Sequence, residues 1–140
     1  MKVRLFNEDD RDGWNKFALV SSDAGLYHLA EWKDVIEKSF RRATYYLIAE
    51  GTNREIQGIL PLVRLKSIFF GNFFVSLPYF NYGGICAVTN EVVDHLLETA
   101  KEITIENSAT HIELRHTSQV TCHLPVKKSK VSMMLALPLN

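Results

Sequence analysis

The sequence contains little of what marks several protein classes. Two cysteines, Cys86 and Cys122, are too few for a disulfide framework, so a cytoplasmic protein with reduced thiols is expected. Lys and Arg number 16, as do Asp and Glu, and this balance does not indicate DNA or an anionic membrane as an obligatory partner. The histidines and cysteines lack the spacing of metal ligands, so no metal site is predicted.

No apolar stretch has the form of a membrane span. The longest run, residues 59–80, is interrupted by Arg64, Lys66, Pro61, Gly71 and Pro78. A set of buried strands fits this run better than a single helix does. The chain passes from Met1 directly into acidic residues at 8–10, so no secretory leader is expected.

The 140 residues have the length of one domain with a sizeable core. Alternating or continuous apolar patterns predict strands at 3–6, 44–50, 56–65, 69–77, 85–88, 111–115 and 131–137. Helices are predicted after an N-cap at Asn7, over about 29–40, and from an N-cap at Asn90 to about 106. Trp14 and Trp32 fall at core positions of the first two helices. Pro61 predicts a bulge or an edge in its strand.

The most distinctive stretch is SLPYFNYGG, residues 76–84, which follows an apolar strand. Tyr79 and Tyr82 supply flat, hydroxyl-tipped surfaces, while Gly83 and Gly84 allow positive φ and close approach of the backbone. Two interpretations stay open from the residues alone. The stretch forms the floor of a ligand site, or it is a tight turn between buried strands, which is the more common outcome.

A second candidate is Glu113-Leu114-Arg115 in a predicted strand. Alternation places Glu113 and Arg115 on one face, where a carboxylate base and a guanidinium would meet at a cleft. The more common outcome is an ion pair on a solvated face. No Ser-His-Asp or Cys-His arrangement is visible by spacing, so the catalytic residues are not assigned.

The predicted fold class is α+β, or α/β with a mixed sheet. Its order, β-α-α-β-β-β-α-β, resembles the acyltransferase fold of the N-acetyltransferase (GNAT) superfamily. The Q/R-x-x-G-x-G/A loop with which that superfamily holds the coenzyme pyrophosphate at a helix N-terminus is absent before Asn90. An ordinary acetyl-CoA enzyme is therefore the weaker interpretation.

Four blocks carry a closer resemblance: EWKDVIEKSF, TYYLIAEG, IQGILPLVRLKSIFFGNFFVSLPYFNYGG and HIELRH. In this order they resemble the N-terminal half of the Fem-type (FemAB-like) transferases, in particular the branch associated with exopolysaccharide and exosortase gene systems. The resemblance covers nearly the whole chain. It implies two tandem GNAT-like domains, with residues 1–140 as the first. Well-understood members move an amino acid from aminoacyl-tRNA onto the peptide of a peptidoglycan precursor.

The resemblance also implies a site. The substrate-binding candidates are Tyr79, Asn81, Tyr82, Gly83 and Gly84 near the precursor, with Glu113 and Arg115 in a recurrent E-L-R strand motif. No resident cofactor is expected, and the acyl donor, aminoacyl-tRNA or acyl-CoA, stays unresolved. The chain alone is expected to be an inactive half that needs a second GNAT-like domain or another copy. The alternatives are a non-catalytic binding or dimerisation module and a stand-alone acetyl-CoA N-acetyltransferase.

Overall fold

The fold is seen in a computed structural model that describes residues 1–116 and Pro125. Its strands are β1 (Lys2–Leu5), β2 (Thr44–Glu50), β3 (Ile56–Ser67), β4 (Gly71–Ser76), β5 (Cys86–Ala87) and β6 (Ile112–Glu113). Its helices are α1 (Arg11–Val20), α2 (Glu31–Ser39) and α3 (Asn90–Glu106), with short 3-10 turns at Glu8–Asp10 and Leu26–His28. None of these helices combines the length and hydropathy that a membrane span needs. The strand predicted at 131–137 lies outside the described residues.

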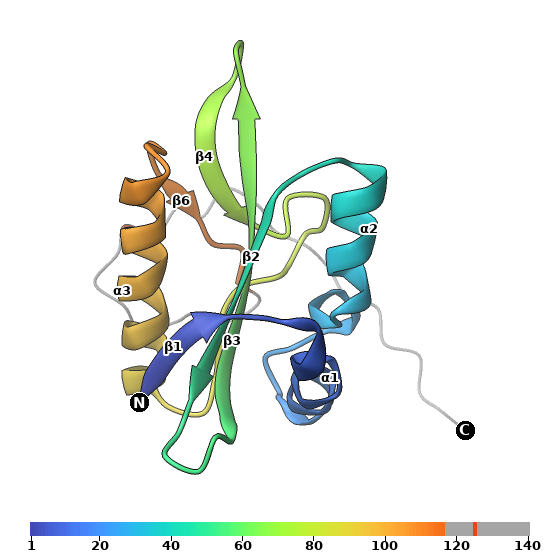
Figure 1. Ribbon diagram of the computed structural model, residues 1–140, viewed down its shortest axis with the longest axis vertical. Coiled ribbons are helices and arrows are strands. Elements are labelled where there is room, and N and C mark those ends of the chain that lie inside the picture. The colour runs from blue at the N-terminus through green and yellow to red at the C-terminus, as the bar shows by residue number, and fades with distance from the viewer. Residues whose placement is uncertain (117–124, 126–140) are drawn as a thin grey trace.

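The strands form one mixed sheet (Figure 1). β1, β2, β3 and β4 are antiparallel neighbours in that order, and β6 lies parallel to β4 at the edge. β5 pairs with β3 in the antiparallel sense. The mixed α/β class and the predicted order of elements are confirmed, including the short strand before the last helix.

Helices cover both faces of the sheet, with α3 on one face and α1 and α2 on the other (Figure 1). Successive residues of β2 therefore enter two different cores. Leu47 and Ala49 pack in the core that includes α3, while Tyr46 and Ile48 pack in the core of α1 and α2. Trp14 stacks on Tyr46 and is fully buried, as predicted. Burial on both faces explains why this strand is apolar throughout.

The predicted helix starts are confirmed in one case and wrong by one residue in another. Asn7 Oδ1 accepts from Asp9 N at 2.9 Å, and Asp10 Oδ2 accepts from Asn7 N at 2.8 Å, so Asn7 caps the first helical segment. Before α3 the N-cap is Thr89, and its Oγ1 accepts a hydrogen bond from Val92 N at 3.4 Å. Asn90 is the first residue of that helix.

Several residues that the apolar patterns place in predicted strands or helices are exposed, among them Phe69, Phe70 and Phe40. Phe69 and Phe70 lie in the turn before β4 rather than in the strand, and Gly71, with φ of 89°, ends that turn. Phe40 is exposed because α2 ends one residue before it. The apolar pattern predicts elements that are too long, because it does not show where the packing against the rest of the domain ends.

On the side away from β2, β3 changes its partner. β4 pairs with it as far as Leu62, and β5 pairs as far as Ile59. Pro61 lies between these two paired segments, at the point where residues 77–85 have left the sheet. Because proline has no backbone N–H, no donor is left without a partner there. Of the two alternatives predicted for Pro61, a bulge or an edge, the structure shows a local edge within β3, since the register with β2 shifts only between Ala49 and Glu50.

Close packing of α3 on the sheet gives a first prediction. A Cβ added to Gly58 would lie 2.6 Å from Val92 Cγ1 and 3.0 Å from Leu96 Cδ1. Because a branched helical side chain has few other rotamers, we expect Gly58→Ala to lower the free energy of unfolding by about 1–3 kcal/mol. Urea denaturation measures this loss. Gly25→Ala is the control, since a Cβ added there would have no atom within 4 Å apart from its chain neighbours. Equal losses in the two variants would contradict the close packing.

Candidate functional site

Residues 77–85, here called the excursion loop, leave the sheet between β4 and β5 and carry the Tyr/Gly stretch. The loop is longer than the tight turn that the residues alone favour. Its first residue, Leu77, has φ of 50° and is fully buried in the core of α1 and α2. A bulky residue in this region is strained by about 1–3 kcal/mol, so packing of the Leu77 side chain holds the start of the loop.

The two glycines bring the end of the loop against its neighbours. A Cβ on Gly83 would lie 2.5 Å from Leu77 Cδ1, and one on Gly84 would lie 2.4 Å from His116 Cδ2. The predicted close approach of the backbone is therefore confirmed. The freedom to adopt a positive φ is not used, since neither glycine lies in the left-handed region.

Arg115, which follows β6, fastens the loop. Its Nη1 donates to the carbonyls of Pro78 at 2.8 Å and Phe80 at 3.0 Å, while its Nε donates to Glu113 Oε1 at 2.8 Å. Its backbone carbonyl also accepts from Gly83 N at 2.9 Å. The guanidinium thus supplies the hydrogen-bond donors that a neighbouring strand would otherwise provide to the loop carbonyls.

His28 supports the loop from the side of the α1–α2 connection. It is only 3% exposed. Its Nδ1 accepts from Gly25 N at 3.1 Å, so the ring proton lies on Nε2, which donates to Gly84 O at 3.0 Å. Burial lowers the pKa of His28, against the opposing effect of its backbone contacts. The ring is neutral and both of its nitrogens are occupied.

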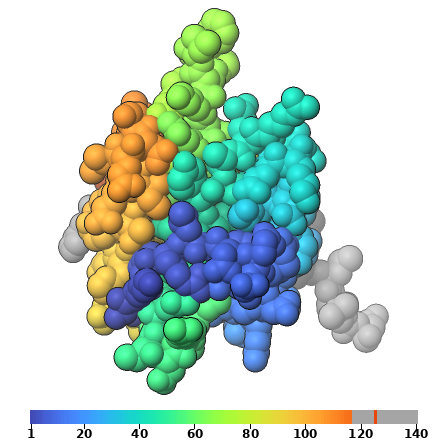
Figure 2. Space-filling model, in the orientation of Figure 1, coloured from blue at the N-terminus to red at the C-terminus, as the bar shows by residue number. Residues whose placement is uncertain are grey.

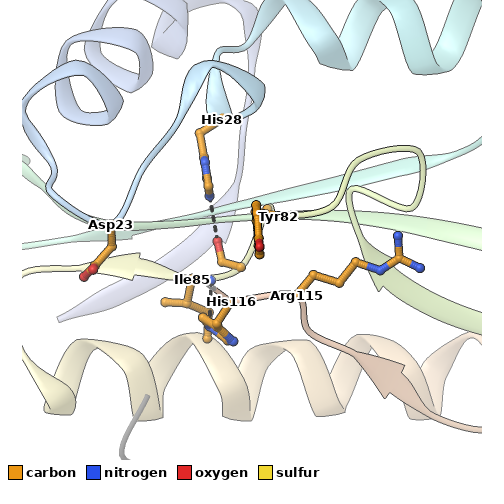
Figure 3. Close-up of a pocket in the computed structure, with 8 residues that line it drawn as sticks. Asp23, His28, Tyr82, Ile85, Arg115 and His116 are labelled. Carbon is orange, nitrogen blue, oxygen red and sulfur yellow. Dashed lines mark hydrogen bonds between the residues drawn. The ribbon is translucent and has the colours of Figure 1, made fainter. Parts of the chain in front are cut away.

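His116 lies on the opposite side of the same peptide unit (Figure 3). Its Nε2 accepts from Ile85 N at 3.0 Å, so its proton lies on Nδ1. Burial lowers the pKa of His116, although the charge of Asp23 raises it. Two neutral imidazoles therefore hold the Gly84–Ile85 peptide between them.

A small pocket opens beside this peptide (Figure 3). The space in it that a water molecule can occupy is about 10 Å³, room for roughly one water and far below the roughly 300–1,000 Å³ of ordinary ligand sites. Its lining residues are Asp23, His28, Tyr82, Gly83, Gly84, Ile85, Arg115 and His116. The pocket is therefore a shallow polar contact point rather than a cavity that encloses a ligand. Within residues 1–116 and Pro125, no cluster of side chains suits a metal ion.

Aromatic side chains hold the outer part of the loop against the connection into α2 and its C-terminal end. Phe80 stacks on Tyr27 with 4.3 Å between ring centroids and meets Trp32 edge-on at 4.7 Å. Tyr79 stacks on Phe40 at 3.9 Å and 14°. Trp32, predicted as core, is half-buried in this aromatic wall.

The structure brings together only part of the predicted site. The predicted residues that line the pocket are Tyr82, Gly83, Gly84 and Arg115. Tyr79 and Asn81 are exposed on the loop outside it, and Glu113 is exposed in its ion pair with Arg115. The substrate-binding role of each remains a prediction.

Sequence reasoning missed Asp23, His28 and His116 as site residues. His28 lies 56 residues before its partner Gly84, so no local spacing connects them. The available signal was the glycine pair itself. Adjacent glycines that do not need a positive φ indicate that a neighbouring side chain occupies their space.

The start of α3 is occupied by contacts within the fold. Val88 N donates to Gln57 O at 2.9 Å, and Thr89 caps the helix with its hydroxyl. Anion binding at a helix N-terminus needs amides that point freely at the ligand. These two contacts reduce the number of amides that a coenzyme phosphate would find there.

No protein-family model and no curated protein matches the sequence. Solved structures do match. The aminoglycoside antibiotic 6'-N-acetyltransferase of Acinetobacter haemolyticus is 14% identical, with a TM-score of 0.61 over 97% of this chain and 100% of that one. A GNAT family acetyltransferase from Staphylococcus aureus is 14% identical, with a TM-score of 0.59 over 96% and 98% of the two chains. The fold is therefore the predicted GNAT-like acyltransferase fold.

FemX is also similar, at 20% identity and a TM-score of 0.52. The match covers 78% of this chain but 25% of FemX, so this chain spans about a quarter of the length of FemX. The likeness to all three proteins is one of fold.

His28, which is buried, and His116, which is half-buried, predict sensitivity to acid. Burial lowers the pKa of both histidines in the folded chain. Below the ordinary histidine pKa of about 6.5, the unfolded chain therefore binds protons that the folded chain does not bind. Stability is complete above this pH and decreases as pH falls toward the folded-state values. We expect a slope of at most about 1.4 kcal/mol per pH unit for each histidine.

Urea titrations between about pH 7 and pH 5 measure this slope. His28→Gln and His116→Gln each remove one titrating group and should each make it shallower. Asp10 and Glu50, whose pKa values are lowered mainly by hydrogen bonds from Arg4, lose their contribution at lower pH and do not obscure this range. An unchanged slope in both variants would mean that the histidines are not the cause.

The Arg115 contacts give a separate prediction. Arg115→Ala removes two charge-assisted hydrogen bonds to loop carbonyls, so we expect a loss of about 1.5–3 kcal/mol and faster hydrogen exchange at Gly83 N and Ile85 N. Glu113→Gln is the control, because an exposed ion pair contributes only about 0–1 kcal/mol. If both variants exchange alike, the carbonyl contacts do not hold the loop.

Proposed function

We propose that this chain is an acyltransferase-type domain of a FemAB-like transferase that acts in cell-envelope biosynthesis, on a peptidoglycan or exopolysaccharide precursor. Such an enzyme moves an amino acid or another acyl group onto an amine of the precursor. One observation carries the proposal: on a GNAT-like fold, Tyr82, Gly83 and Gly84 of the SLPYFNYGG stretch line one polar pocket together with Arg115 of the E-L-R motif. These residues belong to two of the four blocks on which the family resemblance rests.

The size of the pocket supports a shared site. With about 10 Å³ of space it cannot enclose a precursor by itself, and the similarity to FemX covers about a quarter of that protein. In this proposal the chain supplies part of the acceptor site. A second GNAT-like domain, or another copy of the chain, supplies the rest together with the acyl donor.

The chemistry would be direct. The neutral amine nitrogen attacks the carbonyl carbon of an activated acyl ester and a tetrahedral intermediate forms. The ester oxygen then leaves with the electron pair of the broken C–O bond and takes up the proton that the nitrogen releases. His28 is not free to act as a base, and His116 Nδ1 already carries a proton. The chain therefore contributes positioning and fixed dipoles. Tyr82 and Asn81 contact the precursor, and Arg115 fixes the loop.

A second function is a non-catalytic binding or dimerisation module. The occupied ring nitrogens of His28 favour it, because a residue that satisfies buried backbone groups is not available for proton transfer. A concentration-dependent dimer that no ligand stabilises would support this function.

Thermal shifts distinguish these functions. We expect a UDP-linked muropeptide precursor to stabilise the chain, by about 2.7 kcal/mol at 100 times its dissociation constant, and acetyl-CoA to have little effect. Tyr82→Phe should reduce the shift caused by the precursor. Tyr45→Phe is the control, because its hydroxyl donates to Asn107 on the α3 side, away from the loop.

Tyr45→Phe should lower the melting temperature and leave the shift caused by the ligand unchanged. Stabilisation by acetyl-CoA alone would favour a stand-alone acetyltransferase instead. If Tyr82→Phe lowers only the melting temperature, Tyr82 is a core residue and the proposed acceptor site is wrong.

A further inference from the structure

The β3–β4 hairpin projects beyond the rest of the domain (Figures 1 and 2). Its tip carries three successive apolar side chains, Ile68, Phe69 and Phe70, with exposed fractions of 98%, 89% and 83%. Scattered exposed apolar residues are ordinary, but three bulky neighbours on one projecting turn form a patch that indicates an apolar partner.

Basic side chains lie at the base of this tip. Arg41 and Arg42 follow α2 and run beside β3, where Arg42 Nη1 donates to Lys66 O at 3.4 Å. Lys38 is exposed in the last turn of α2. We call Lys38, Arg41, Arg42 and Lys66 the basic ledge. Residues 56–90 contain no Asp or Glu, so the balanced total charge conceals a local positive region.

Arg41 occupies a position where glycine is the usual residue. It has φ of 51°, and the next amide, Arg42 N, donates to Ile36 O at 3.3 Å, which closes the C-terminus of α2. A non-glycine residue is strained there. Strain of this kind persists only where the surrounding structure holds the residue, and here the backbone places the Arg41 charge beside the hairpin.

We propose that the hairpin tip inserts into the surface of an anionic lipid bilayer while the basic ledge contacts the lipid phosphates. A single narrow turn can enter between head groups, whereas a protein partner of matching shape would need a socket of its own. Aromatic side chains favour the membrane interface, and each Lys or Arg near an anionic surface adds attraction. This proposal does not depend on the proposed function.

The test is cosedimentation of the whole chain with vesicles of phosphatidylcholine alone or of phosphatidylcholine with phosphatidylglycerol. We expect binding to the anionic vesicles only, weakened by salt. The double variant Phe69→Ser, Phe70→Ser should lower the partition coefficient at least about tenfold. Lys66→Gln with Arg41→Gln should weaken binding and reduce its dependence on salt.

Leu19→Ser with Val20→Ser is the matched control, because these side chains are 76% and 78% exposed on α1, away from the hairpin. It should bind as the unchanged chain does. Circular dichroism confirms that each variant is folded. Lack of binding to anionic vesicles, or equal binding by the tip variant, would overturn the proposal. Dissociation of a dimer by the tip variant, without any binding to vesicles, would do so as well and would assign the tip to a protein contact.

Discussion

The free edge of β3 is the constraint on which the site depends. β2 follows β3 along one side, but on the other side β4 ends before β5 begins, and residues 77–85 have no neighbouring strand. Buried backbone groups must still find partners. They find them in His28, His116 and the guanidinium of Arg115. The polar pocket therefore exists because a broken ladder has to be completed by side chains.

This origin limits what the pocket can do. An imidazole that accepts from a buried amide loses that contact when it is protonated, so His116 cannot take up a proton without releasing Ile85 N. The state of the loop and the protonation of its supports are thus coupled. A site built in this way is better suited to holding a substrate group in one geometry than to moving protons, and any base would have to come from outside these contacts.

Much of the fold follows from local pattern. The apolar patterns predict the strands, the helices and a mixed sheet, and the sheet that forms is covered by helices on both faces. Thr89 and Asn90 are both good caps, so the sequence cannot place the start of α3 to one residue. The pocket is less predictable. Its loop and Arg115 have recognisable motifs, whereas His28 reaches Gly84 only because the α1–α2 connection folds across the sheet.

The hairpin tip and the excursion loop are linked through one strand and one helix end. β4 begins beside the tip and ends at the loop, and Tyr79 of the loop stacks on Phe40, the residue before Arg41. A bilayer that held the tip and the basic ledge would therefore lie on the side of the molecule where Tyr79 is exposed. A substrate carried on a lipid head group would reach the loop along this aromatic stack without crossing the sheet. The same geometry gives a physical reason for an exposed apolar tip near an aromatic loop, since both would face one surface.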